Sequence, residues 1–162
     1  MRLFLFLLAL WAGGVTAQIP RTKSGQFEYS GEVSGVNAHL IKEKAARFFN
    51  QPFLVHWDSI ARDAHGNRVL GTGYITVRAK QHAVGFPSEV NVFMQFEIEV
   101  LDGGYRYKVS HFMVEQPDAR NFPLETKPAT VKRMAYDQLK HKTHERVSFI
   151  IGWLKKYMQE EG

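Results

Sequence analysis

The chain has 162 residues, with 21 basic and 16 acidic side chains and a formal net charge of +5 at pH 7. This length is enough for one domain with a hydrophobic core of its own. The sequence contains no cysteine, which excludes disulfide bonds, thiolate metal sites, a cysteine nucleophile and a lipid-modified cysteine. The positive charge is mild and basic residues alternate with acidic ones, so we expect no nucleic-acid partner.

The first 17 residues have the pattern of a secretory signal peptide. Arg2 gives a basic start, residues 3–12 form an apolar run, and Val15-Thr16-Ala17 ends the segment. An uncleaved membrane anchor is less favoured, because the run is shorter than the ~20 residues that cross a bilayer. We therefore expect cleavage after Ala17, export to the periplasm or beyond, and a mature chain without a membrane anchor.

The mature chain, residues 18–162, predicts a single α+β domain. Residues 18–25 are polar and form a flexible start, and residues 26–34 alternate as a first strand. Gly31 interrupts this strand and suggests a bulge. Apolar residues at helical spacing then predict a helix over residues 36–49.

Two further strands are expected before the centre of the chain. Residues 53–63 and 68–80 form them, with a turn at residues 65–67. Gly71 and Gly73 interrupt the second of these strands, which indicates that another element packs closely against it.

Residues 89–115 predict a long β-hairpin. Apolar residues occupy the even positions of its first half and polar residues most of the odd ones, which is the period of a strand with one buried face. The Asp-Gly pair at its centre favours a two-residue turn. That turn places Glu97 opposite Lys108 and Glu99 opposite Arg106 on an outward face.

The same register places Phe93 opposite Phe112 on the outward face. Two aromatic rings paired on a polar face indicate a surface for a partner. The alternative is that the proline-rich segment 116–130 folds over both rings through Phe122 or Leu124.

The end of the chain completes the expected fold. Residues 116–130 hold three prolines and predict an irregular surface loop. Residues 131–139 and 143–160 then predict two helices or one continuous helix. The order strand, helix, four strands, helix predicts an antiparallel sheet of about five strands with two helices packed on one face, leaving the other toward solvent.

Several of these segments together resemble a family of exported bacterial domains of unknown function with a TATA-binding-protein-like (TBP-like) fold. They are the signal peptide, the first strand and helix with Phe48-Phe49, the strand with Gly71-Thr72-Gly73, and the most specific segment, FEIEVLDGGYRYKVSHF at residues 96–112. The resemblance implies that fold and export from a Gram-negative cell. It brings no activity, cofactor or catalytic residue, and the fold name does not imply DNA binding.

One histidine cluster has the spacing of metal ligands. His141 and His144 lie three residues apart with Glu145 adjacent, which on a helix can place two ligands on one face. No third ligand is identifiable by spacing, and the order differs from the zinc-protease motif. We therefore expect a solvated helix surface and no metal.

A second cluster raises the question of hydrolysis. One expected strand contains His56, Asp58, Ser59 and Asp63. Serine, histidine and aspartate are the residue types that form a catalytic triad. The sequence has no nucleophile turn around this serine. We therefore expect a protein that is not an enzyme.

These observations favour a non-catalytic secreted or periplasmic binding or structural module, without a cofactor. Its expected partner is a protein, an envelope polymer or an apolar ligand, bound at Phe93, Phe112 and residues 116–130. The alternative is a carrier with a small apolar ligand between the sheet and the C-terminal helix, in a cavity lined by Met94, Phe96, Tyr107 and Ile151. A hydrolase around His56 and Asp58 is less favoured.

Overall fold

The computed structural model describes residues 19–36, 38–51, 55–78, 89–116 and 119–160. The expected signal peptide and its cleavage site after Ala17 lie outside these residues. In chain order the elements are β1 (Tyr29–Ser34), α1 (Ala38–Phe48), β2 (His56–Arg62), β3 (Arg68–Arg78), β4 (Glu89–Leu101), β5 (Gly104–Val114), β6 (Phe122–Pro123) and α2 (Arg133–Gln159).

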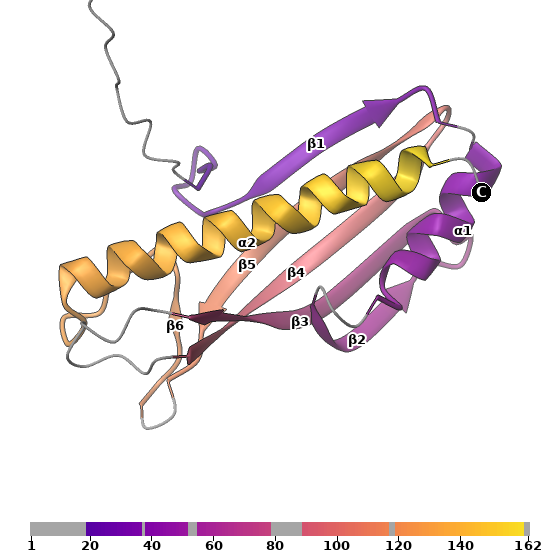
Figure 1. The fold of residues 1–162 in the computed structure, drawn as a ribbon. Coiled ribbons are helices and arrows are strands. Elements are labelled where there is room, and N and C mark those ends of the chain that lie inside the picture. Colours follow the sequence, from indigo (N-terminus) through magenta and orange to yellow (C-terminus); the bar gives the residue numbers. More distant parts are fainter. Residues whose placement is uncertain (1–18, 37, 52–54, 79–88, 117–118, 161–162) are drawn as a thin grey trace, which may run out of the picture.

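The strands form one antiparallel sheet in the order β1-β5-β4-β3-β2, and the short β6 pairs with the end of β5. Both helices cover the same face, and α2 runs along the length of the sheet with its C-terminal end beside α1 (Figure 1). The expected α+β architecture, a single antiparallel sheet with two helices on one face, is confirmed. No helix of the described residues lies on the opposite face, and we call it the open face.

Alternation along the long strands divides the side chains between these two faces. In β3 and β4 every second residue is buried against the helices, and the residues between them are exposed or half-buried on the open face. The buried set joins one side of each helix in a single hydrophobic core. Burial of this apolar surface is the main term that stabilises the two layers against each other.

The expected register of the hairpin is confirmed from its turn to the middle of its strands. Glu97 lies opposite Lys108, Glu99 lies opposite Arg106, and Gly104 faces Leu101 across the turn. The side chains form ion pairs over a wider area than the register alone suggested. Arg68 Nη2 on β3 lies 2.7 Å from Glu97 Oε2, whereas Lys108 pairs with Glu28 across β1.

Beyond the middle of the hairpin the expected register is wrong. Gln95 lies opposite Ser110, but Phe93 lies opposite Met113, so two residues of β5 stand against one residue of β4. This is a β-bulge, and His111 within it has a φ of 59°. The extra residue turns Phe112 onto the helix-covered face and Met113 onto the open face.

The pairing of Phe93 with Phe112 is therefore a wrong prediction. Phe112 is 1% exposed, and its ring meets the ring of Tyr29 edge to face at 6.0 Å. Its carbonyl accepts a hydrogen bond of 2.9 Å from the backbone N–H of Leu124. Leu124 and Phe122 are themselves buried, so this part of the proline-rich segment completes the core beside Phe112.

Four smaller expectations are also settled. The register of β1 against β5 continues through Gly31 without a bulge, because Gly31 leaves space for the Tyr107 ring, which a Cβ would overlap. Gly71 leaves the same kind of space for the ring of Phe49, as expected. The segment expected to be irregular contains β6, and the C-terminal region is one continuous helix.

A polar contact joins α2 to β1 inside this packing. The Tyr29 hydroxyl and His144 Nδ1 are 2.8 Å apart. Burial raises the pKa of Tyr29, so its hydroxyl stays protonated. Burial lowers the pKa of His144, and His141 lowers it further while Glu145 opposes both effects. Both pKa shifts favour the uncharged forms of the two side chains.

None of the helices in the described part of the chain is long and apolar enough to span a membrane.

The bulge predicts that alanine substitutions at the two phenylalanines lower stability by unequal amounts. Phe112→Ala should lower the free energy of unfolding by about 3–5 kcal/mol, because it leaves a cavity in the core. Phe93→Ala should cost about 1 kcal/mol or less, because it removes only cross-strand contacts on the open face. Urea denaturation of both variants measures the difference, and equal losses would contradict the bulged register.

The Tyr29–His144 contact predicts a pH dependence of stability. The pKa of His144 is lower in the folded protein than the ~6.5 of an unperturbed histidine. The unfolded chain therefore binds the proton first as the pH falls, so stability should decrease below about pH 6.5 until the folded-state pKa is passed. His144→Gln should flatten this decrease in urea denaturation between neutral and mildly acidic pH. The exposed His65→Gln variant is the control, and slopes equal to wild type in both variants would rule out a contribution from His144.

Candidate functional site

One line of side chains interrupts the polar surface of the open face. It consists of one residue from each of five neighbouring strands, each directly opposite the next. In order across the sheet they are His56 on β2, Tyr74 on β3, Phe93 on β4, Met113 on β5 and Pro123 on β6. We call these five cross-strand neighbours the open-face row. Neighbouring strands are about 4.8 Å apart, so the row extends for roughly 19 Å across the sheet.

The rings within the row contact one another. The imidazole of His56 is stacked on Tyr74 with the ring centroids 5.0 Å apart and an angle of 8° between the planes. The rings of Tyr74 and Phe93 follow at 5.4 Å. Tyr74, Phe93 and Met113 are half-buried, which places aromatic and thioether surface within reach of a partner.

The part of the open face nearer the hairpin turn is mainly polar. The hydroxyls of Ser59 and Thr72 are 2.6 Å apart, and beyond them lie the ion pairs between strands. Arg106 contacts both Glu32 and Glu99 there. Exposed ion pairs of this kind contribute about 0–1 kcal/mol each, so they maintain a hydrated surface more than they stabilise the fold.

On its other side the row borders a polar network and a hollow. Thr76 Oγ1 donates to Asn91 Oδ1 at 2.9 Å, and Asn91 Nδ2 donates to Glu115 Oε2 at 2.7 Å. The hollow has a volume of about 320 Å³ and is lined by His56, Tyr74, Thr76, Glu89, Val90, Asn91 and Glu115. An apolar strip with hydrogen-bonding groups along one side has the chemistry of a protein-binding surface, where a central apolar contact is surrounded by polar groups.

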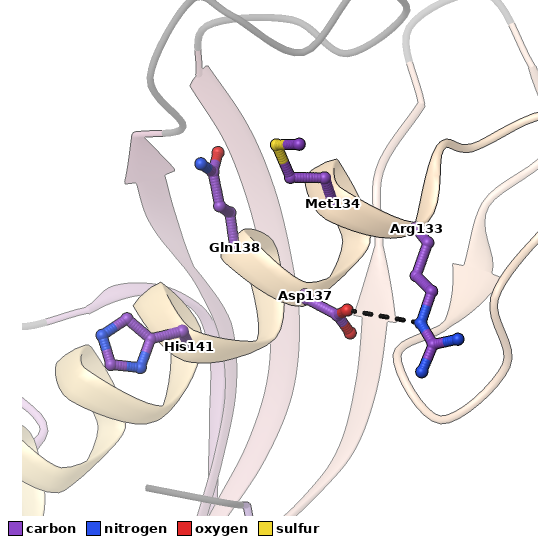
Figure 2. A pocket seen from close by; sticks show the side chains of 5 residues that line it. All are labelled: Arg133, Met134, Asp137, Gln138 and His141. Carbon is purple, nitrogen blue, oxygen red and sulfur yellow. Dashed lines mark ion pairs between the residues drawn. The ribbon is translucent and has the colours of Figure 1, made fainter. Parts of the chain in front are cut away.

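Two further hollows lie on other parts of the surface. One of about 400 Å³ lies at the β1 edge and includes Tyr29 and Tyr107 in its lining. Another, of about 580 Å³, lies over the first turns of α2. Figure 2 shows its lining side chains, with Met134 and Gln138 directed to the same side and Asp137 directed toward Arg133. All five of its described lining residues belong to one helix, so it is an open depression and not an enclosed pocket.

The cavity of the carrier hypothesis is not among these hollows. Met94, Phe96 and Ile151 pack in the core between sheet and helices and line none of the three. Tyr107 lines only the hollow at the β1 edge.

The hydrolase cluster does not form a triad in its observed contacts. The Ser59 hydroxyl is engaged with Thr72, His56 is stacked on Tyr74, and Asp63 accepts a hydrogen bond from the backbone N–H of Arg68 in the adjoining turn. A triad requires the serine to bond to the histidine, and Ser59 instead bonds across the strand pair.

The histidine pair on α2 diverges. His144 is directed into the Tyr29 contact, while the exposed His141 has its Nε2 3.1 Å from Glu145 Oε1. Over the described residues, no three His, Cys, Asp or Glu side chains are grouped as metal ligands.

Sequence reasoning identified Phe93 in the row but missed its neighbours. Tyr74 could have been found, because the alternation of β3 assigns it to the same face. Met113 could not, because its face depends on the bulge at His111, and Pro123 belongs to a strand of two residues. Phe112, the other residue of the expected surface, belongs to the core.

Comparison with known proteins gives a structural match alone. No family model and no curated protein matches the sequence. A crystal structure of a TBP-like protein from Parabacteroides distasonis superposes with a TM-score of 0.67 at 13% identity, over 89% of this chain and 99% of the other. A DUF4468 family protein from Bacteroides ovatus superposes with a TM-score of 0.63 at 12% identity, over 88% and 91%. The chain therefore has the TBP-like α+β fold, which the resemblance of its hairpin implied.

Proposed function

We propose that the protein is an exported, non-catalytic binding module that holds an extended segment of a partner protein on its open face. The observation that carries this proposal is the open-face row, a line of mainly apolar side chains that crosses five strands of a mostly polar surface. Tyrosine, phenylalanine and methionine are enriched in protein interfaces, and aromatic rings bury large areas at low conformational cost.

The shape of the row favours a protein segment over a small molecule. Small-molecule sites are concave and enclose most of the ligand, whereas the row lies on a sheet surface. The hydrogen-bonding groups of Asn91 and Glu115 lie beside it. A chain that crosses the strands can place side chains on Tyr74 and Phe93 while its backbone reaches these groups.

Two further features support the non-catalytic role and the export of the protein. Two residues of the hydrolase hypothesis are engaged in hydrogen bonds away from His56, Ser59 with Thr72 and Asp63 with the backbone of Arg68, which supports a non-catalytic role. The signal-peptide pattern of residues 1–17 supports export. The envelope is then the compartment in which to look for the partner.

The row predicts a position-specific crosslink. A photoreactive phenylalanine analogue at Phe93 should give a defined protein adduct in the native cell envelope, and Tyr74→Ser with Met113→Ser should remove it. The same analogue at Phe149, an exposed aromatic residue on α2, is the matched control. Identical adducts at both positions, or an adduct at Phe93 that survives the two serine substitutions, would exclude the row as the binding surface.

Export predicts a defined N-terminus. The protein isolated from the periplasm or medium of its native cell should have the intact mass of residues 18–162, because the small residue Ala17 precedes the cleavage site. Ala17→Lys should block processing. A mass that includes residues 1–17 in the wild-type protein would show that export by this route is wrong.

A further inference from the structure

The charges of this protein are divided unequally between its two layers. Helices α1 and α2 together contain nine basic and three acidic residues. The strands contain five basic and five acidic residues. The sheet is therefore neutral, and the helical layer has an excess of six positive charges.

Each acidic residue of the two helices forms an ion pair with a basic residue, and the helices carry more basic residues than these pairs use. Glu43 pairs with Arg47, Asp137 with Lys140, and Glu145 with Lys142. Glu160, directly after α2, lies 3.8 Å from Lys156. The exposed basic side chains of this layer are Lys42, Arg47, Arg133, Lys142, Lys155 and Lys156. A surface of this kind attracts anions at a distance and orients the molecule toward them.

The same layer exposes large apolar side chains. Met134 is 70% exposed and Phe149 is 56% exposed, and both lie on α2. At 3.6 residues per turn, their separation of 15 residues brings them to nearly the same side of the helix, opposite its buried side. Lys142 and Lys156 lie seven residues before and after Phe149, on that same outward side. Figure 2 shows Met134 in the first turn of α2, at the start of this face.

We propose that the outward face of α2 binds the surface of an anionic lipid bilayer. The cations would contact lipid phosphates, and Phe149 and Met134 would enter the boundary between headgroups and acyl chains. A soluble polyanion would use the cations but would leave the two apolar side chains in water, so the combination favours a bilayer. The open-face row lies on the opposite side of the molecule and would remain accessible to its partner.

Vesicle binding tests this proposal. The chain is used from Gln18, because the apolar residues 3–12 would themselves bind lipid and the whole described core lies after residue 18. Vesicles of phosphatidylglycerol mixed with phosphatidylcholine should bind the protein, and vesicles of phosphatidylcholine alone should not. Added salt should weaken the binding, because it screens the charges.

Variants separate the contribution of the cations to vesicle binding from that of the exposed apolar side chains. Lys142→Gln with Lys156→Gln should lower the affinity roughly 25-fold, at about fivefold for each charge near an anionic surface. Phe149→Ser with Met134→Ser should lower it about tenfold, through the loss of inserted apolar area. The controls are Ile60→Ser, which removes an apolar side chain of 41% exposure from β2, and Arg62→Gln on the same strand. Both should bind as the wild type does, and circular dichroism should show that all variants are folded.

Three results would overturn the proposal. The first is the absence of binding to phosphatidylglycerol vesicles. The second is an equal loss in the two β2 controls. The third is binding to soluble inorganic polyphosphate as strong as to vesicles and unchanged by Phe149→Ser with Met134→Ser, which would identify a site for polyanions in solution.

Discussion

The β-bulge at His111 determines which side chains at the end of β5 face the core and which lie on the open face. Before it, every second residue of β5 faces the helices, as in an ordinary strand. The extra residue reverses that alternation, so Phe112 is buried and Met113 is brought beside Phe93. The left-handed backbone of His111 costs about 1–2 kcal/mol, whereas burying a phenylalanine side chain contributes about 1.5–3 kcal/mol. Packing of Phe112 therefore outweighs the strain, and the added hydrogen bond from Leu124 favours the same result.

The two sides of the molecule are consequently different in chemistry. On one side the open-face row gives an apolar strip on a neutral sheet. On the other, α2 carries an excess of cations with Phe149 and Met134 exposed between them. The proposed partner and the proposed bilayer would occupy opposite sides, which allows both to be bound at once. The hydrophobic core lies between these two surfaces, because both helices pack on the same face of the sheet.

Much of this fold could be predicted from the sequence, because the strongest signals are local. Alternating apolar residues and an Asp-Gly turn give the hairpin, and the register of Glu97 with Lys108 follows from the turn alone. The bulge could not be predicted, because Ser110-His111-Phe112 contains no glycine and its geometry is imposed by tertiary packing. The two-residue β6 has too few residues to show a period. For these reasons the candidate surface was half predicted, with Phe93 placed correctly and Phe112 placed on the wrong face.

Paired cysteines measure the central claim most directly, since the chain has no cysteine of its own. Directly opposed residues on one face have Cβ atoms about 4.5–5.5 Å apart, close enough for a disulfide after a small adjustment. Phe93→Cys with Met113→Cys should form an intramolecular disulfide under mild oxidation, detected by intact mass. Phe93→Cys with Phe112→Cys should remain reduced while folded, because the two side chains point to opposite faces of the sheet. A disulfide in the second pair and none in the first would show that β5 has no bulge at His111, and the open-face row would then not exist.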